Sequence, residues 1–440
     1  MTLPHMQPDP CSKQAPSVYR AHRVSDWLPG DHFTDKTWLQ GLVRYVDEHP
    51  KELHPVLRVF QQLIESESQL YFLAQSMFEQ VPAKGPYADD PSGYRQIRDF
   101  EHMLRVLNHL IITAPLWDEQ SERLSMIAVR MKAVLDWPMG TRSGFAFFLD
   151  PVVNRMLKRV LDAWGDFLRS EESARQALGE DDNGWFNPKA KAAITTAANQ
   201  ATGTAHDFAE IFECDPSKPH YGFRSWDAFF TRTFREGIRP VAAPEDDAVI
   251  ANACESKPYK VAYDCALRDK FWIKGEPYSL VDMLAHDALA PRFAGGTVYQ
   301  GFLSALSYHR WHAPVAGRCV KAYVQPGTYY SEPLVNVGDR EARGGGGPED
   351  KPTSQAYVTA VATRAIIFIE ADNPAIGLMI TVQEGQRVQK GGQLGMFHFG
   401  GSTHCVVFRR ETDVRGFPGP GTETIVPVRG QLAVVEGRRT

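Results

Sequence analysis

The segment LGMFHFGGSTHCVVF, residues 394–408, places a serine directly after two glycines and between two apolar runs. Because Gly400 and Gly401 lack a Cβ, they can adopt backbone conformations that other residues avoid, and they let other groups approach the carbonyl before Ser402. The apolar residues ahead of the glycines and the run Cys405–Phe408 predict two buried strands that meet at a tight turn. Taken alone, the segment predicts a glycine turn with a capping serine. The rest of the chain decides whether the serine has a further role.

The composition is that of a globular chain. Its 440 residues are 43% hydrophobic, which suffices for a large core and predicts two or three domains. The net charge is −5, from 48 Lys and Arg against 53 Asp and Glu, and there is no long basic run, so we expect no nucleic-acid partner. The start lacks a secretory signal, and no window reaches the roughly 18 apolar residues that span a bilayer. We expect a soluble, cytoplasmic protein.

Cysteine usage gives no sign of a metal or redox framework. The six cysteines are scattered along the chain without CxxC spacing. Neither a zinc site nor a set of disulfides is therefore indicated, and we expect most of these thiols to be buried.

Helical periodicity dominates the first part of the chain, after residues 1–30, which we expect to form a poorly ordered tail. Apolar residues at spacings of four, three and four lie on one helix face; they are Phe100, Leu104, Leu107 and Ile111. A later helix, with Met156, Val160, Trp164 and Phe167 on one face, has a start signal, since Asp150 can cap the free amides and Pro151 stands where a missing N–H costs nothing. We expect a helical N-terminal domain over residues 31–225.

The pattern changes towards the second half. After a helix near residues 189–198, Ser225 can cap a short amphipathic helix that Gly237 and Pro240 stop, and this helix is the expected domain junction. Beyond it, β-branched and aromatic runs alternate with Gly and Pro, as in strands and turns; the runs are 298–302, 364–370 and 376–382. The polar, glycine-rich stretch 338–352 predicts a surface loop. The predicted fold class is α+β, with an all-helical N-terminal domain followed by a mostly β domain over residues 226–440.

Two histidines stand close together in GFLSALSYHRWHAPVAG, residues 301–317. His309 and His312 would share a face of a helix, but they would point to opposite sides of an extended strand. Pro314 and Gly317 favour a strand or bend, so the spacing alone gives no support for a shared metal, and we assign none. Taken in isolation, such histidines are more often core groups with satisfied hydrogen bonds than catalysts.

Four blocks in a fixed order carry a family resemblance. They are DAFFTRTFREGIRP from Asp227, IKGEPYSL from Ile273, YHRWHAPVAG from Tyr308 and the GGST that ends at Thr403. Their order resembles that of phosphatidylserine decarboxylases. Further stretches are similar to a fungal branch of this family, the pyruvoyl-dependent L-tryptophan decarboxylases of psilocybin biosynthesis; they are TRSGFAFF at Thr141, GWFNPKA at Gly184, YGFRSWDAFF at Tyr221 and LGMFHFGGS at Leu394. The resemblance spans most of the chain and implies a catalytic β domain of this family.

The resemblance implies that the chain cuts itself between Gly401 and Ser402. The serine would attack the preceding glycine carbonyl, and elimination from the resulting ester would leave a pyruvoyl group, so the cofactor is a covalent pyruvate made from Ser402. In the family the second histidine of the YHRxH block is the base, which here is His312. An aspartate orients that base in the family, and Glu255 stands at the matching position.

Decarboxylation is expected to follow from the same resemblance. The pyruvoyl carbonyl can condense with the amine of an amino acid and accept the electrons released as carbon dioxide leaves. His309, which matches the first histidine of the block, is assigned the protonation of the product, with His312 as the alternative.

Three functions stay open. The first is decarboxylation of a free aromatic amino acid, with L-tryptophan ahead of others, so the partner would be a small molecule. The second is decarboxylation of phosphatidylserine to phosphatidylethanolamine, which requires contact with a membrane although no basic interfacial helix is evident. The third is an unprocessed, noncatalytic homologue, because a strand-forming stretch that the family has after Ile380 is reduced here to residues 381–383.

Overall fold

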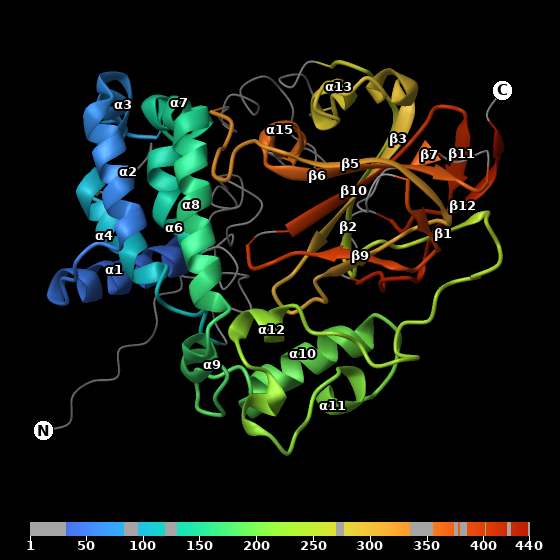
Figure 1. The fold of residues 1–440 in the computed structure, drawn as a ribbon, viewed down its shortest axis with the longest axis horizontal. Helices are drawn as coiled ribbons and strands as arrows, with labels where there is room; N and C mark the ends of the chain where they lie inside the picture. The colour runs from blue at the N-terminus through green and yellow to red at the C-terminus, as the bar shows by residue number, and fades with distance from the viewer. Residues whose placement is uncertain are drawn as a thin grey trace, which may run out of the picture.

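The structure is a computed structural model that describes residues 32–82, 96–118, 130–269, 277–334, 355–373, 377–378, 385–400, 402–419 and 424–438. Helices make up the N-terminal part and antiparallel sheets most of the C-terminal part (Figure 1), so the predicted α+β class is confirmed. Several predictions lie outside the described residues: the N-terminal tail, the loop 338–352, most of the strand 376–382 and the shortened stretch 381–383.

The helices of the first part pack around one apolar core. They are α1 (His32–Glu48), α2 (Pro55–Ser66), α3 (Ser68–Glu79), α4 (Phe100–Leu110), α6 (Arg130–Met139), α7 (Arg142–Leu149), α8 (Pro151–Leu168), α9 (Glu171–Ala177), α10 (Pro188–Gln200), α11 (Phe208–Ile211) and α12 (Trp226–Phe230), with the 3-10 turn η5 (Pro219–Gly222) before α12. The predicted apolar face of α4 is buried, and its Phe100 meets Phe60 of α2 edge to face at 5.7 Å between ring centroids. Burial of each such side chain contributes roughly 1.5–3 kcal/mol.

The start of α8 is the one that its sequence predicts. The carboxylate of Asp150 accepts hydrogen bonds from the amides of Val152 and Val153, and Pro151 occupies the first turn. Met156, Val160 and Trp164 on the predicted face are buried, and Phe167 is half-buried.

The junction helix α12 is shorter than predicted. Ser225 caps it as expected, by accepting from the amide of Ala228, but the helix ends at Phe230, well before Gly237. Side chains explain the early end, because the Thr231 hydroxyl donates to the carbonyl of Asp227 and the Arg232 guanidinium donates to that of Phe229. The bond from Arg232 satisfies the Phe229 carbonyl, which a further helical turn would otherwise bind, whereas the Asp227 carbonyl already accepts from the amide of Thr231 at 2.9 Å. Gly237 lies in a later turn, at φ +83°.

The strands of the second part form antiparallel sheets. They are β1 (Val249–Ala251), β2 (Lys257–Cys265), β3 (Gly296–Leu303), β4 (Arg310–His312), β5 (Gly317–Gln325), β6 (Arg364–Ala371), β7 (Gly377–Leu378), β8 (Arg387–Val388), β9 (Gln393–Met396), β10 (Ser402–Phe408), β11 (Thr412–Arg415) and β12 (Gln431–Arg438). Hydrogen-bonded neighbours run β1-β12-β11, β10-β3-β2, β4-β9 and β7-β6-β5-β8. The short helices α13 (Leu280–Met283) and α15 (Gln355–Val361) and the 3-10 turn η6 (Ala290–Phe293) lie among them.

The two strands that flank the glycines do not pair with each other, so the predicted arrangement of two strands about one tight turn is wrong. β9 pairs with β4 and β10 pairs with β3, so the two strands belong to different sheets. Strand β9 is also only half-buried. The reason lies in the apolar faces, because Val406 and Phe408 of β10 bury against Tyr299 and Leu303 in one core cluster.

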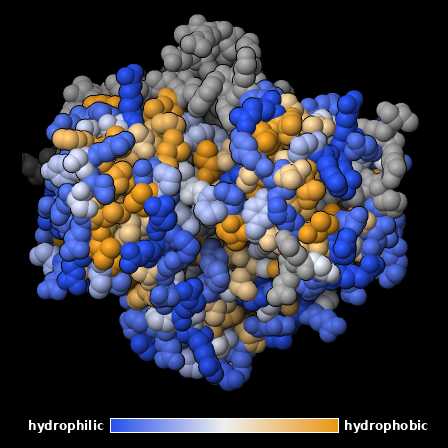
Figure 2. All heavy atoms as spheres, turned by 45° about the horizontal axis from the view of Figure 1, so that its top comes forward, coloured by the Kyte–Doolittle hydropathy of each residue, from blue (hydrophilic) through white to orange (hydrophobic). Residues whose placement is uncertain are grey.

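The surface carries apolar side chains among polar ones. On the left of Figure 2, where the helices of the first part lie, apolar residues reach the surface in several places. The most exposed is Phe72 of α3, at 66%. Within the described ranges, no helix is long and apolar enough to cross a membrane.

Buried polar contacts join the helical part to the strands. Lys132 of α6 forms an ion pair with Glu332, which follows β5 and is fully buried. The amide oxygen of Asn154 in α8 accepts a hydrogen bond from the backbone amide of Tyr329 at 3.0 Å. The position of the helices relative to the sheets is therefore fixed by paired polar groups as well as by apolar packing.

Lys132→Met should destabilise the protein, because the buried carboxylate of Glu332 would lose its cation. Breaking a buried ion pair from one side costs about 3–5 kcal/mol. Chemical denaturation followed by tryptophan fluorescence measures the change. Lys158→Met is the matched control, since it removes the lysine of an exposed pair with Asp162 and should cost less than about 1 kcal/mol. Equal losses in the two variants would contradict the assignment.

Candidate functional site

Ser402 is buried at the first position of β10, opposite Leu303 of β3. Its hydroxyl donates to the carbonyl of Gly400, with 3.3 Å between the oxygens. Gly400 has φ +153°, which side chains with a Cβ rarely adopt. Gly401, the other half of the expected cleavage site, lies outside the described residues. The serine hydroxyl is thus directed back towards the chain that precedes it.

The strand that carries the histidines packs on the same core as the serine. Side chains alternate along a strand, so Ser402 shares a face of β10 with Val406 and Phe408. That face packs on a core cluster to which Trp311 and Ala313, the neighbours of His312, also belong. Strand β10 and the residues on either side of His312 therefore pack on one core.

The segment that leads to Ser402 also runs beside the first histidine. The backbone amide of Phe397 donates to the carbonyl of His309 at 2.8 Å. This bond continues the pairing of β9 with β4 beyond the end of both strands. The turn and the histidine block are therefore neighbours in space.

His312 is held by contacts to both ring nitrogens. Nδ1 lies 2.9 Å from the carbonyl oxygen of Gly391, and Nε2 lies 3.2 Å from the hydroxyl of Tyr308. A carbonyl can only accept, so the proton of the neutral ring sits on Nδ1 and the lone pair on Nε2. Nε of Arg429 donates to the same Gly391 carbonyl at 2.9 Å and, at the longer distance of 3.2 Å, its N–H is also directed at Nδ1, so the shorter bonds to the carbonyl set the tautomer. Nε2 is therefore the basic atom of His312.

Burial, with the nearby Arg429 cation, lowers the pKa of His312 to about 4. The ring is neutral at pH 7 and can accept a proton. Burial also raises the pKa of Tyr308 to about 12, so its hydroxyl stays protonated beside Nε2.

His309 is buried just before β4, in different surroundings. Its ring stacks on Phe230 of α12, with the ring centroids 3.7 Å apart. Burial, and then the cation of Arg232, lower the pKa of His309 well below its usual value. Nδ1 has no hydrogen-bond partner among the described residues. Like His312, this ring is neutral at pH 7.

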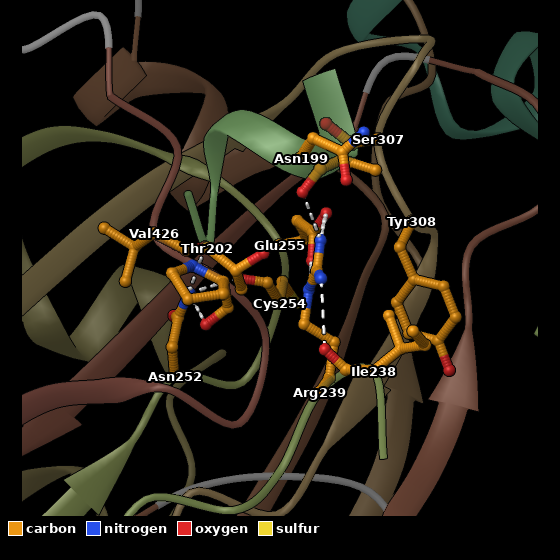
Figure 3. A network of polar contacts seen from close by, with 12 residues as sticks. Asn199, Thr202, Ile238, Arg239, Asn252, Cys254, Glu255, Ser307, Tyr308 and Val426 are labelled. Carbon is orange, nitrogen blue, oxygen red and sulfur yellow. Dashed lines mark hydrogen bonds and ion pairs between the residues drawn. The ribbon is translucent and has the colours of Figure 1, made fainter. Parts of the chain in front are cut away.

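Glu255 pairs with Arg239 and not with His312, the predicted partner. Nε of Arg239 donates to Oε2 at 2.7 Å and Nη2 donates to Oε1 at 2.9 Å, with both side chains buried (Figure 3). Nη2 also donates to the carbonyl of Ala198 in α10 at 2.8 Å. Because the guanidinium occupies both carboxylate oxygens and His312 binds elsewhere, the prediction that Glu255 orients His312 is wrong. A guanidinium matches a carboxylate with two charge-assisted bonds, which a neutral imidazole cannot do.

Four residues of the site were not predicted. Three of them, Tyr308, Gly391 and Arg429, orient His312. Of these three, only Tyr308 stood in a motif of the sequence, the YHRWH block. His404 lies two residues after Ser402, on the same face of β10. It is half-buried, both ring nitrogens are covered and without a partner among the described residues, and burial lowers its pKa to about 4. The alternation in STHCVV could have placed it beside the serine.

The described residues contain no group of three or more His, Cys, Asp or Glu side chains arranged to hold a metal ion. The candidate residues are instead a buried serine and buried histidines whose rings are neutral at pH 7. Neutral imidazoles with covered nitrogens can accept or pass protons, and buried surroundings strengthen each polar interaction.

Comparison with known proteins adds an independent finding. Two family models, both described as phosphatidylserine decarboxylase, match residues 54–194 and 226–423. The chain is 39% identical to the decarboxylase iboD of Amanita muscaria over 69% of this chain and 91% of that protein. It is 35% identical to an L-tryptophan decarboxylase of Psilocybe cubensis over 83% of each. A phosphatidylserine decarboxylase proenzyme of Oryza sativa subsp. japonica is 27% identical over 76% of this chain and 50% of that protein.

Arg429→Gln should raise the pKa of His312 from about 4 towards its usual value, because the positive charge that opposes the imidazolium is removed. Burial remains, so the pKa should stay below about 6.5. An NMR titration of ¹³C-labelled histidine, with the signal assigned by His312→Gln, measures the shift. Arg318→Gln, at an exposed position of β5, is the control and should leave that signal unchanged. A pKa of His312 that does not move in Arg429→Gln would contradict the proposed contact.

Proposed function

Because the chain belongs to the phosphatidylserine decarboxylase family and is a carboxy-lyase, we propose that it cuts itself between Gly401 and Ser402 and then decarboxylates a free aromatic amino acid, L-tryptophan first. The observation that carries the proposal is the buried serine that follows two glycines at the start of β10, with its hydroxyl turned towards the preceding chain. The choice of substrate is supported by the relatives, since the identity to an L-tryptophan decarboxylase, 35%, exceeds that to the lipid enzyme of Oryza sativa, 27%.

Self-cleavage begins at the serine hydroxyl. Oγ of Ser402 attacks the carbonyl carbon of Gly401, an ester bond forms, and the peptide bond to the nitrogen of Ser402 breaks as that nitrogen gains a proton. Loss of the α-proton and of the Gly401 carboxylate leaves a dehydroalanine at position 402. Addition of water and release of ammonia convert this group into the pyruvoyl group, so one water is consumed and one ammonia is formed.

His312 is the base that we assign to this step. Its Nε2 carries the lone pair, because the Gly391 carbonyl holds the proton on Nδ1. The Tyr308 hydroxyl donates its hydrogen bond to Nε2, so it does not compete with Nε2 for the serine proton. When Nε2 takes up that proton, the hydrogen bond from Tyr308 is lost. General-base assistance of this kind contributes about 10²–10⁴-fold to a rate.

A pyruvoyl group at position 402 is supported by the burial of Ser402 and by the neutral rings of His309 and His312, the residues assigned to act with it. Such a group supplies a ketone that condenses with the substrate amine and accepts the electrons released as carbon dioxide leaves. His309, stacked on Phe230, is the residue that we assign to return a proton to the product carbon. A neutral imidazole does this by giving up its N–H proton and regaining one at the other nitrogen. Burial of these residues excludes water from the site.

The cleavage predicts two chains, residues 1–401 and 402–440, the second of 39 residues (440 minus 401). Mass spectrometry of the purified protein should show the shorter chain with a blocked, pyruvoyl N-terminus. Ser402→Ala should remain whole, because the attacking oxygen is absent. A wild-type chain that stays intact after long incubation would instead identify a noncatalytic homologue.

Substitution of each histidine tests the role that we assign to it. His312→Gln should slow cleavage by about 100-fold or more, because the base is lost. His309→Gln should cleave and then decarboxylate slowly. If both variants mature and turn over like the wild type, neither histidine has the assigned role.

The substrate is tested in one carbon dioxide assay, with free L-tryptophan in detergent-free buffer on one side and phosphatidylserine vesicles on the other. We expect release from tryptophan without added pyridoxal phosphate. Phenylhydrazine, or borohydride together with substrate, should abolish it, since both react with the ketone or its adduct. Turnover of the vesicles alone would show that the lipid is the substrate.

A further inference from the structure

The segment before Ser402 is anchored by the ring of Phe399. This ring lies against three aromatic side chains, which we call the aromatic socket: Trp226 at 4.7 Å between centroids, Trp164 at 5.3 Å and Phe230 at 5.4 Å. The interplanar angles are 83°, 87° and 84°, so all three contacts are edge to face. Each pair of this geometry contributes about 0.5–1.5 kcal/mol beyond the burial of area.

The walls of the aromatic socket belong to the helices and are fixed independently of Phe399. Trp164 comes from α8, and its Nε1 donates to the carbonyl of Thr113 at 3.0 Å. Trp226 and Phe230 come from α12, where they stack on each other at 5.0 Å. All three are buried in the core of the helical part, and Phe399 is the residue from between β9 and β10 that packs against that core. The socket is therefore a preformed feature into which Phe399 docks.

Helix α12 also holds His398, the residue before Phe399. Nδ1 of His398 lies 2.8 Å from Oδ1 of Asp227 in α12. The hydrogen bond to Asp227 raises the pKa of His398, as expected for an ion pair that favours the charged ring. Two successive residues of the turn are thus fixed to α12, one by charge and one by ring packing.

On the other side of the turn, Ser402 is fixed by the pairing of β10 with β3. Between the two fixed points stand only Gly400 and Gly401, the residue type with the greatest backbone freedom. Attack on the Gly401 carbonyl requires this freedom to be restricted, because a reacting atom displaced by about 1 Å can cost about 100-fold in rate. Anchors on both sides of the glycine pair supply the restriction.

We propose that Phe399 is a positioning residue for self-cleavage: its docking in the aromatic socket fixes the chain that leads into the bond between Gly401 and Ser402. The proposal rests on the self-cleavage proposed above. The docking of Phe399 gives the helical part a role in maturation, because all three side chains of the socket come from that part. Phe230 is also the ring on which His309 stacks, so the same wall supports the turn and the histidine.

The test is a pulse-chase of cell-free translation that follows conversion of the whole chain into its two products. Phe399→Ala should lower the first-order rate constant by about tenfold or more. Phe399→Tyr keeps the ring and should restore cleavage to within about threefold of the wild type. The matched control is Phe145→Ala, which removes a half-buried ring that packs on Tyr357 at 6.1 Å between centroids and not in the socket, and it should cleave like the wild type.

Three further measurements separate positioning from loss of the fold. In the Ser402→Ala background, which cannot cleave, Phe399→Ala should keep the near-UV circular dichroism spectrum and a single cooperative unfolding transition. Combining Trp164→Ala with Phe399→Ala should slow cleavage no more than the slower single variant, because both remove the same contact. Turnover per mole of pyruvoyl group in the matured fraction of Phe399→Ala should stay within about twofold of the wild type.

The outcomes distinguish this inference from the proposed function. Wild-type cleavage with an equal rate in Phe399→Ala overturns the role of Phe399 and leaves self-cleavage standing. A slow Phe399→Ala whose turnover per pyruvoyl group falls by the same factor also overturns it, since the defect would then be general. A wild-type chain that never cleaves overturns the proposed function and this inference together.

Discussion

The pairing of β10 with β3 is the constraint on which the site depends. It runs from Ser402 opposite Leu303 to Phe408 opposite Thr297, and it is kept in register by apolar side chains on both faces. A slip by one residue would exchange the two faces and turn Ser402 away from the core that it shares with the histidine block. On the opposite face, the Thr403 hydroxyl donates to the Gly301 carbonyl and accepts from the Gln300 side chain, which adds to the same register. The serine is thus placed by the packing of residues far from it.

Burial without countercharges sets the electrostatic character of the site. The buried pair of Arg239 with Glu255 is neutral as a whole, and its remaining hydrogen bonds go to the carbonyls of Ala198 and Ile238 (Figure 3). The histidines have no carboxylate partner of that kind, so desolvation dominates and the rings stay neutral. A base that acts at neutral pH needs this property, since a protonated ring could not accept the serine proton.

Helix α12 connects the helical part to the site. Through Asp227 it holds His398, and through Trp226 and Phe230 it holds Phe399 and supports His309. The sequence marked this stretch as a junction between domains from its cap and its aromatic residues. Its contacts show that the junction also holds the segment that leads to Ser402, because a short helix with most of its side chains buried packs against both neighbours at once.

Local chemistry in the sequence determined the helical and strand segments, the caps at Asp150 and Ser225, and the resemblance that joined Ser402 with His309 and His312. These features depend on residues close together in the chain or on ordered motifs, so they can be read without a fold. Only the tertiary structure decided which strands pair, that Arg239 and not His312 takes Glu255, that Gly391 and Arg429 orient His312, and that Phe399 meets Trp164. Each of these contacts joins segments distant in sequence, and their choice depends on competition among buried partners: a carboxylate pairs with the guanidinium that can bind both its oxygens, and a strand pairs where its apolar face is covered.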